Sequence, residues 1–311
     1  KVCGSGLKCV MLAAQSIKAG DNQIVVAGGM ESMSSAPYIL PWGRRGLRVG
    51  DARVLDSLVH DGLRCSVEGW MMGDAAEFIA SEYGLTRLHL DQFALESHQK
   101  AVAAMDAGKF DTEIIPVEIK ASDGTSTIVK NDEDPRRDTS LGALAKLQPT
   151  FVDDGIVTAG NSPGLNDGAA VLVLSSRANA QEGGQKPLAH IVAYGQVSIE
   201  PKWLFDAPAT VIPLVLEKAG WSLGDIDLIE LNEAFAAQAL ANGRALEKQG
   251  WDWEKVNVHG GAIALGHPVG ASGARILVTL LNALHDRGLC RGLASLCLGG
   301  GEALAIAIEL E

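Results

Sequence analysis

The chain has few aromatic side chains, a deficit of basic ones and no long apolar run. Aromatic residues make up 5% of its 311 residues, whereas 36 are glycine, so tight turns and close backbone approaches are favoured over a bulky aromatic core. The 26 basic residues are outnumbered by 38 acidic ones; the net charge of −12 argues against a nucleic-acid partner. No apolar run reaches the ~20 residues of a membrane span, so no membrane association is predicted.

Paired cysteines and the common cofactor motifs are also lacking. The five cysteines are odd in number and none forms Cys-x-x-Cys, which argues against a disulfide framework or a zinc knuckle. There is no His-Glu-x-x-His, no Gly-x-Gly-x-x-Gly after a strand, no P-loop and no Gly-x-Ser-x-Gly. The sequence therefore argues against a zinc hydrolase, a Rossmann dehydrogenase, a P-loop enzyme and a serine hydrolase, and no metal or bound cofactor is expected.

The chain starts at Lys1 rather than at Met, and a helical pattern follows almost at once. We therefore expect the sequence to be a fragment or processed product that lacks its N-terminal segment. The cysteine usage predicts a reducing compartment, and the cytoplasm is the predicted location. Organelle targeting stays open, because the segment that would hold a targeting peptide precedes Lys1.

Helical and strand patterns alternate along the chain. Apolar residues at helical spacing predict helices over about 3–17, 68–83, 90–107, 211–219, 234–246 and 270–284. Short apolar runs predict strands over 24–27, 114–119, 169–174, 189–194, 226–231, 293–298 and 303–308. The run 24–27 is predicted to be buried on both faces. This alternation indicates a layered α/β fold, and the irregular stretch at about 34–150 is predicted to be an inserted, lid-like region.

The order serine-glycine, helix, apolar strand, glycine cluster occurs twice. The first copy runs from Ser5-Gly6 to Gly28-Gly29, and the second from Ser272-Gly273 to the glycines at 299–301. A duplicated α/β unit would explain the echo and would place two helix N-termini at one site. A chance similarity of common α/β elements explains it equally well.

Two residues beside glycines are candidates for a nucleophile and a base. Cys3 precedes Gly4 and a helix, where the helix dipole and the unpaired amides favour the thiolate. The alternative is a small buried hydrophobic residue. His267 lies in a glycine-rich loop before Pro268 and a helix, a setting that often holds catalytic groups. The alternative is a histidine that is hydrogen-bonded within a turn.

Two further candidates follow predicted strands. Cys297 ends an apolar strand directly before a glycine cluster, where site residues of α/β folds gather. Taken alone, a core cysteine is the simpler interpretation. Asn232 and Glu233 stand between a strand and a helix, and taken alone Asn232 is more simply interpreted as the N-cap of that helix.

Together these motifs resemble the thiolase family of acyl-CoA acyltransferases. The resemblance runs from Val2 to the end of the chain in six separated blocks, at 3–6, 27–33, 160–170, 232–235, 260–268 and 297–301. It implies a thiolase fold of two similar layered α/β halves, over 1–165 and 166–311, with a loop domain inserted in the first at about 34–150. It also implies that the first half is incomplete, since the family's first strands and helices would precede Lys1.

The resemblance implies a reversible Claisen condensation without metal or cofactor. Cys3 would take up the acyl group as a thioester, His267 would accept the Cys3 proton, and Cys297 would remove the α-proton of acetyl-CoA. Asn232 would fix a water that forms an oxyanion hole with His267. The amides of Cys3 and Gly299 would form a second hole.

The implied substrates are acyl-CoA and acetyl-CoA or free coenzyme A, in fatty-acid metabolism of either direction. Their predicted contacts are Met72, Arg136, Ser162, Ala234 and Phe235, although a solvated basic loop explains Arg136 equally well. Pro163, where the family usually has serine, and Met71, where some members have histidine, leave the acyl chain length open. Family members are usually dimers or tetramers, so a homodimer or homotetramer is expected.

Two rival functions are considered. A decarboxylating ketoacyl synthase of the same superfamily uses a Cys-His-His set, so Cys297 speaks against it. A non-catalytic thiolase-like binding or assembly protein is disfavoured because Cys3, Asn232, His267 and Cys297 are all retained.

Overall fold

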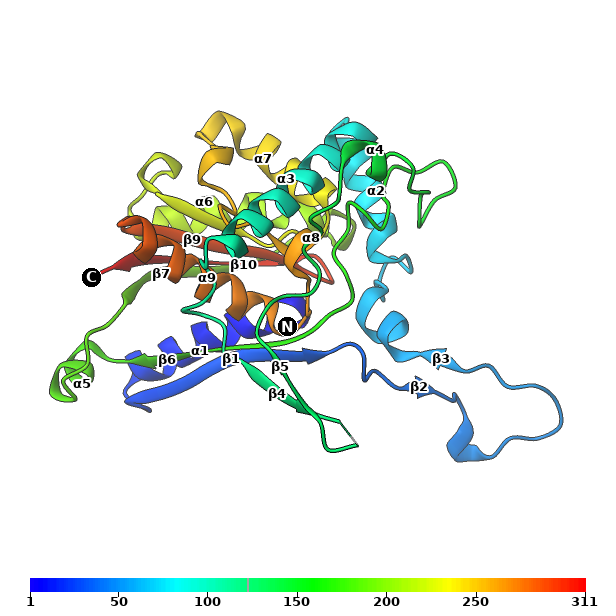
Figure 1. The fold of residues 1–311 in the computed structure, drawn as a ribbon, viewed down its shortest axis with the longest axis horizontal. Helices are drawn as coiled ribbons and strands as arrows, with labels where there is room; N and C mark the ends of the chain where they lie inside the picture. Colours follow the sequence, from blue (N-terminus) through cyan, green and yellow to red (C-terminus); the bar gives the residue numbers. More distant parts are fainter. Residues whose placement is uncertain (122) are drawn as a thin grey trace.

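The computed structural model describes residues 1–121 and 123–311. Its main layer is a four-stranded sheet of order β7-β10-β9-β8, formed by β7 (Ala189–Ser198), β8 (Leu228–Leu231), β9 (Arg291–Leu298) and β10 (Glu302–Leu310). Figure 1 labels β7, β9 and β10 of this sheet. β8 and β9 run parallel, whereas β10 is antiparallel to both of its neighbours. The apolar runs of β8, β9 and β10 are almost wholly buried, because helices cover both faces of this sheet.

The side chains of β10 explain how the two helical layers pack. Leu304, Ile306 and Ile308 point to α1 (Ser5–Ala19) and α9 (Ser272–Arg287) on one face. The alternating alanines 303, 305 and 307 point to α6 (Ala207–Ala219) on the other face, which is also covered by α7 (Ala236–Leu246). Large residues on one side and small ones on the other fit the two-residue period of a strand and let α6 approach the sheet closely.

A second, two-stranded sheet lies across α1 and α9 from the first (Figure 1). It pairs β1 (Ile24–Ser32) with β6 (Asp167–Ser175) in antiparallel register. Val25 and Leu172 pack on the helices, but Val26 and Val173 on the opposite face are 67% and 71% exposed. The prediction that the run 24–27 is buried on both faces is therefore wrong, since helices cover only one face of this sheet.

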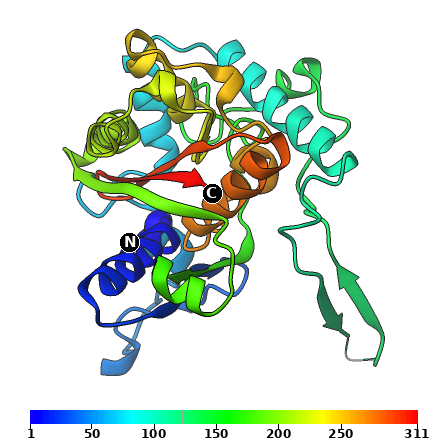
Figure 2. The ribbon, with the colours of Figure 1, turned by 90° about the vertical axis from the view of Figure 1, so that its left-hand side faces the viewer.

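The segment between β1 and β6 combines two hairpins with helices. The hairpins are β2 (Tyr38–Ile39) with β3 (Leu55–Asp56), and β4 (Val117–Lys120) with β5 (Ser126–Val129). Figure 2 shows the β4–β5 hairpin standing away from the rest of the chain. By contrast, α2 (Met72–Glu82) and α3 (Arg87–Asp106) pack against α7 and the main body.

Short elements complete the chain. They are η1 (Val2–Gly4), η2 (Gly43–Arg45), η3 (Leu58–Leu63), α4 (Leu141–Leu144), α5 (Arg177–Glu182), η4 (Pro201–Asp206), η5 (Leu223–Asp225), η6 (Glu247–Gln249), η7 (Trp253–Lys255) and α8 (Ala262–Leu265). Within the described residues, no helix combines the length and the apolarity that crossing a membrane requires.

The predicted helices and strands all occur, with shifted ends. Four helices begin later than predicted: α2 starts four residues later, at Met72, and α1, α7 and α9 each start two residues later. The predicted boundary at 165/166 stays a prediction. We note that β6, which follows this boundary, pairs with β1 in the first half of the sequence.

Candidate active site

The N-termini of α1 and α9 meet, because glycines let the two backbones touch. The Gly6 amide donates to the Gly270 carbonyl oxygen at 3.1 Å. A Cβ on Gly6 would lie 2.6 Å from the amide nitrogen of Ala274, and a Cβ on Gly273 would lie 2.6 Å from that of Leu7. The two serine-glycine helix starts of the sequence echo therefore lie side by side, as the duplication hypothesis expected.

Cys3 lies in the short turn η1 directly before α1. The Gly299 amide donates a hydrogen bond to its thiol and lowers its pKa, but burial raises the pKa more strongly, to about 11. The expectation that the helix N-terminus favours the thiolate is therefore wrong, since the desolvation of the sulfur outweighs the amides. At neutral pH Cys3 is a protonated thiol with Gly299 beside it.

Cys297 is buried near the end of β9, opposite Ala303 of β10. Burial raises the pKa of its thiol well above the ordinary value, and negative charge on Cys3 raises it further. The two sulfurs therefore lie close enough for a negative charge on Cys3 to act on Cys297. The core-cysteine interpretation describes the burial of Cys297 but leaves out this second thiol.

His267 follows α8 and is also buried. Its Nδ1 lies 2.6 Å from Ser272 Oγ, and the Ser272 hydroxyl donates to the Pro268 carbonyl oxygen at 2.9 Å. Because the hydroxyl has one proton, this network assigns the imidazole proton to Nδ1 and leaves Nε2 as an acceptor. Burial, aided by the charge of Arg275, lowers the pKa of His267 to about 4. The ring is neutral and can accept a proton at Nε2.

Asn232 follows β8 and is directed at this ring. Its side-chain Nδ2 lies 3.5 Å from His267 Nε2. Its backbone N–H donates to the Ser295 carbonyl oxygen at 3.0 Å. Its buried Oδ1 has no hydrogen-bond partner in residues 1–121 and 123–311. The N-cap interpretation is wrong, because α7 begins four residues later and Phe235 precedes its first residue.

Glu233 fixes the segment that leads to His267. Its carboxylate accepts from Ser97 Oγ at 2.7 Å, Asn257 Nδ2 at 2.8 Å and the Ile263 amide at 3.1 Å. These donors lower its pKa, but burial has the larger effect and raises it. Glu233 thus holds α8 in place while lying outside the reacting groups.

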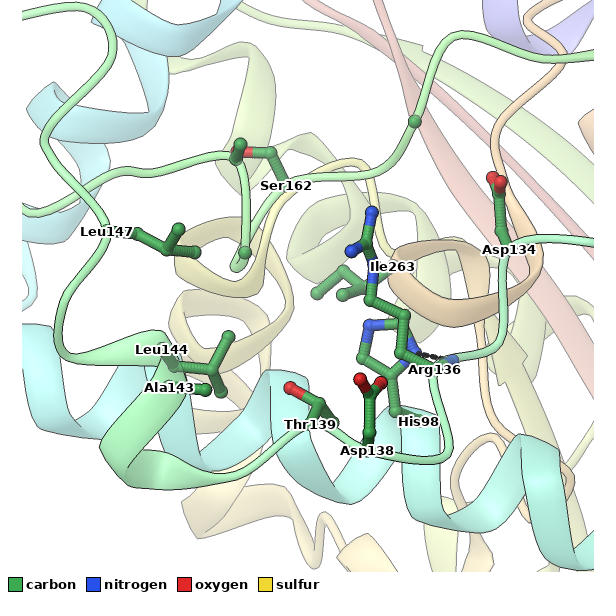
Figure 3. A pocket seen from close by; sticks show the side chains of 13 residues that line it. His98, Asp134, Arg136, Asp138, Thr139, Ala143, Leu144, Leu147, Ser162 and Ile263 are labelled. Carbon is green, nitrogen blue, oxygen red and sulfur yellow. Dashed lines mark hydrogen bonds between the residues drawn. The ribbon is translucent and has the colours of Figure 1, made fainter.

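Two of the predicted substrate contacts line one cavity of about 290 Å³ (Figure 3). Arg136 and Ser162 share it with His98, Asp134 and Ile263. The Ser162 hydroxyl donates to the Thr158 carbonyl oxygen at 2.8 Å, so it is held by its own loop.

The other predicted contacts lie around Cys297. Ala234 and Phe235 are buried in the same apolar cluster as Cys297, and Met72 packs against this cluster from α2. Ile263 belongs to both the cluster and the cavity. The cavity of Arg136 and the cluster of Cys297 are therefore adjacent regions joined at Ile263.

Sequence reasoning missed three positions. Ser272 fixes the His267 ring, and Asn166 and Asp134 form hydrogen bonds that lead to the His267 backbone. Ser272 was visible only as the start of a helix, and Asn166 only as part of a motif. Across the described ranges, no three His, Cys, Asp or Glu side chains are grouped so that they could hold a metal ion.

Comparisons with known proteins agree with this geometry. The family model for the thiolase N-terminal domain matches residues 1–178, and that for the thiolase C-terminal domain matches residues 185–310. The chain is 50% identical over 311 residues to a Pseudomonas aeruginosa protein named acetyl-CoA acetyltransferase, and 52% identical over 309 residues to one of that name from Cupriavidus necator. These alignments cover 100% and 99% of this chain and 78% of each relative.

Solved structures give the same picture. The acetyl-CoA acetyltransferase of Bacillus anthracis matches with a TM-score of 0.95 and 45% identity, over 100% of this chain and 77% of that one. The corresponding protein of Syntrophomonas wolfei matches with a TM-score of 0.97 and 43% identity, over 100% and 78%. The predicted thiolase fold is confirmed, and the chain belongs to the thiolase family.

Proposed function

We propose that the chain is an acetyl-CoA acetyltransferase, which transfers acyl groups reversibly between acyl-CoA and acetyl-CoA through a thioester on Cys3. The names of its relatives support this reaction. The single observation that carries it is the position of the Cys3 thiol directly before α1, with the Gly299 amide beside it lowering its pKa. This contact puts a nucleophile next to a fixed donor for the charge that develops on an attacked carbonyl oxygen.

In the first half-reaction, the Cys3 proton moves to His267 Nε2 and the sulfur attacks the acyl carbonyl carbon. The amides of Cys3 and Gly299 donate to the resulting oxyanion; each such donor is often worth ~3 kcal/mol. The carbon–sulfur bond to coenzyme A then breaks, and the departing thiolate takes the Cys297 proton. Acylated Cys3, a Cys297 thiolate and a protonated His267 remain, so the charges balance.

In the second half-reaction, the Cys297 thiolate removes the α-proton of acetyl-CoA. The new carbanion attacks the Cys3 thioester, Cys3 leaves as a thiolate, and it recovers its proton from His267. His267 and a water bound at the free Oδ1 of Asn232 stabilise the enolate oxygen. All three groups return to their starting protonation states, and the reverse sequence cleaves a 3-ketoacyl-CoA with free coenzyme A.

Substrate binding divides between the two adjacent regions. The cavity with Arg136 and Ser162 receives coenzyme A, whose phosphates suit a guanidinium. The apolar surface of Met72, Ala234 and Phe235 lies beside the acyl group, near Cys297. The proposal also includes assembly as a homodimer or homotetramer. The proposed location is the cytoplasm.

The test is the intact mass of the chain after mixing with acetoacetyl-CoA, followed by peptide mapping. We expect one acetyl group on the peptide that contains Cys3, and none on a Cys3→Ala variant. A folded chain that takes up no acetyl group would contradict the proposal and favour a thiolase-like binding protein.

A further inference from the structure

Asn166 links the His267 loop to the rim of the Arg136 cavity. Its Oδ1 accepts a hydrogen bond from the His267 amide at 3.0 Å, and its Nδ2 donates to Asp134 Oδ2 at 2.6 Å. Its own amide donates to Met33 Sδ at 3.3 Å. The Asn166 carboxamide thus accepts from the His267 backbone through its oxygen and donates through its nitrogen to Asp134, which lines the cavity.

The backbone before His267 is shaped to admit this side chain. Gly266 has a φ of +90°, which side chains rarely allow, and a Cβ there would lie 2.5 Å from Asn166 Cγ. The His267 residue is therefore held at two points. Asn166 holds its backbone amide, and Ser272 holds Nδ1 of its ring.

We propose that Asn166 and Asp134 are positioning residues, which set the direction of His267 Nε2 toward the Cys3 proton. The inference deepens the proposed function and depends on it. Neither residue touches the reacting atoms. Asp134 orients the Asn166 carboxamide so that its oxygen, and not its nitrogen, faces the His267 amide, because a carboxylate accepts hydrogen bonds but cannot donate them.

Exchanging the donor and the acceptor tests this arrangement. Asn166→Asp keeps an oxygen for the His267 amide but sets two carboxylates at hydrogen-bond distance, so they repel. Adding Asp134→Asn supplies the missing donor from the opposite side and restores both bonds. The double variant isolates the Asn166–Asp134 hydrogen bond, because it differs from Asn166→Asp only at position 134 and has the net charge of the wild type.

The experiment uses the 311-residue chain. It measures the rate of Cys3 acetylation by acetoacetyl-CoA, the KM for acetoacetyl-CoA, the melting temperature and the ¹⁵N NMR signals of the His267 ring. For Asn166→Asp we expect a rate about ten- to a hundredfold below wild type with little change in KM, as for other residues that orient a site group. The double variant should return to within about threefold. Asn22→Asp adds the same charge at an exposed position and should acetylate like the wild type.

The outcomes separate the two proposals. A wild-type chain that does not acetylate would contradict the proposed function. His267 signals that are unchanged in Asn166→Asp would overturn the inference, whatever the activity. A double variant that melts like the wild type but stays as slow as the single variant would overturn it as well. Recovery of rate and signals together is the result expected.

Discussion

Cys3 and His267 are both uncharged at neutral pH, and burial is the first cause for each. Burial raises the pKa of Cys3 to about 11 and lowers that of His267 to about 4. A resting thiolate–imidazolium pair would need these pKa values in the opposite order. Proton transfer therefore belongs to the attack on the substrate, when the oxyanion donors receive the new charge.

This resting state has a pH signature. Between about pH 6 and 9, the rate of Cys3 alkylation by iodoacetamide should rise about tenfold per pH unit, because only the thiolate reacts and its fraction grows at that rate below the pKa. Peptide mapping would assign the modified residue. A rate that stays level across this range would show a preformed thiolate and contradict the neutral pair.

Removing each of the two thiols should block a different step of the reaction. Cys3→Ala should abolish acyl-enzyme formation, because no nucleophile remains. Cys297→Ala should still accept an acetyl group on Cys3 from acetyl-CoA, whose thiolate can leave without that residue, but form no acetoacetyl-CoA, because no base takes the α-proton. Mass spectrometry measures the first step and product formation the second. Condensation at the wild-type rate in Cys297→Ala would refute the role assigned to Cys297.

Ser272 offers a third test at the residue scale. Ser272→Ala removes the partner of His267 Nδ1 and frees the ring to turn or to move its proton to Nε2. A hydrogen bond of ~1 kcal/mol corresponds to roughly a fivefold loss in acetylation rate, which sets the lower limit expected. Ser272→Thr keeps the hydroxyl and serves as the control. Equal losses in both variants would indicate a packing effect.

At the scale of elements, the contact between α1 and α9 positions the site. Cys3 precedes α1, and Ser272, which holds His267, begins α9. Since a Cβ on Gly6 would collide with the α9 backbone, Gly6→Ala should force the helices apart. We expect a loss of roughly 1–3 kcal/mol in unfolding free energy and a larger relative loss of acetylation, measured by denaturation and mass.

Gly142→Ala is the matched control, because a Cβ there meets nothing within 4 Å and the residue lies inside the short helix α4. It should be neutral or stabilising. Equal destabilisation by both alanines would contradict the close contact as the cause.

The same scale shows what the sequence can predict. Helical spacing identified α1 and α9; Gly20 marked the end of α1, whereas glycines marked only the start of α9, whose end at Arg287 lies three residues beyond the predicted one. The exposure of β1 was not predictable, since a continuous apolar run looks the same whether one or two layers cover it. The short strands β2 and β3 were missed because two residues carry no period.

For the site, motifs identified Cys3, His267 and Cys297 as candidates, and the structure brings Cys297 within reach of a charge on Cys3. The protonation of Cys3 was not predictable, because desolvation depends on segments that are distant in sequence. The contact of Asn166 with His267 spans 101 positions, so no local pattern could indicate it.

At the scale of the whole molecule, acidic side chains are numerous, and some are buried. Glu230 lies 3.5 Å from Arg275 and is 2% exposed, and burial raises its pKa to about 8 despite this arginine. Glu113 and Glu233 add negative charge nearby, while Lys100 offsets part of it. The folded chain therefore holds a proton on Glu230 that the unfolded chain has already lost at neutral pH.

This difference links stability to pH. Because the folded state binds the proton more tightly, the contribution of Glu230 falls as pH rises from about 4.5 to about 8, by on the order of 1 kcal/mol per pH unit at most. Glu230→Gln cannot ionise, so its unfolding free energy relative to wild type should be higher at pH 8 than at pH 5. Urea denaturation at both values measures it. A difference that is constant with pH would contradict the raised pKa.

The protonated state of Cys3 also determines which cysteines of the molecule are oxidised first. Peroxide attacks thiolates and converts them to sulfenic acid, so a thiol with a pKa of about 11 is a poor target between turnovers. All five cysteines are free, and Cys9 and Cys290 are exposed. Oxidative damage should therefore begin at these two surface thiols, which lie outside the site, while the nucleophile survives in its reduced form.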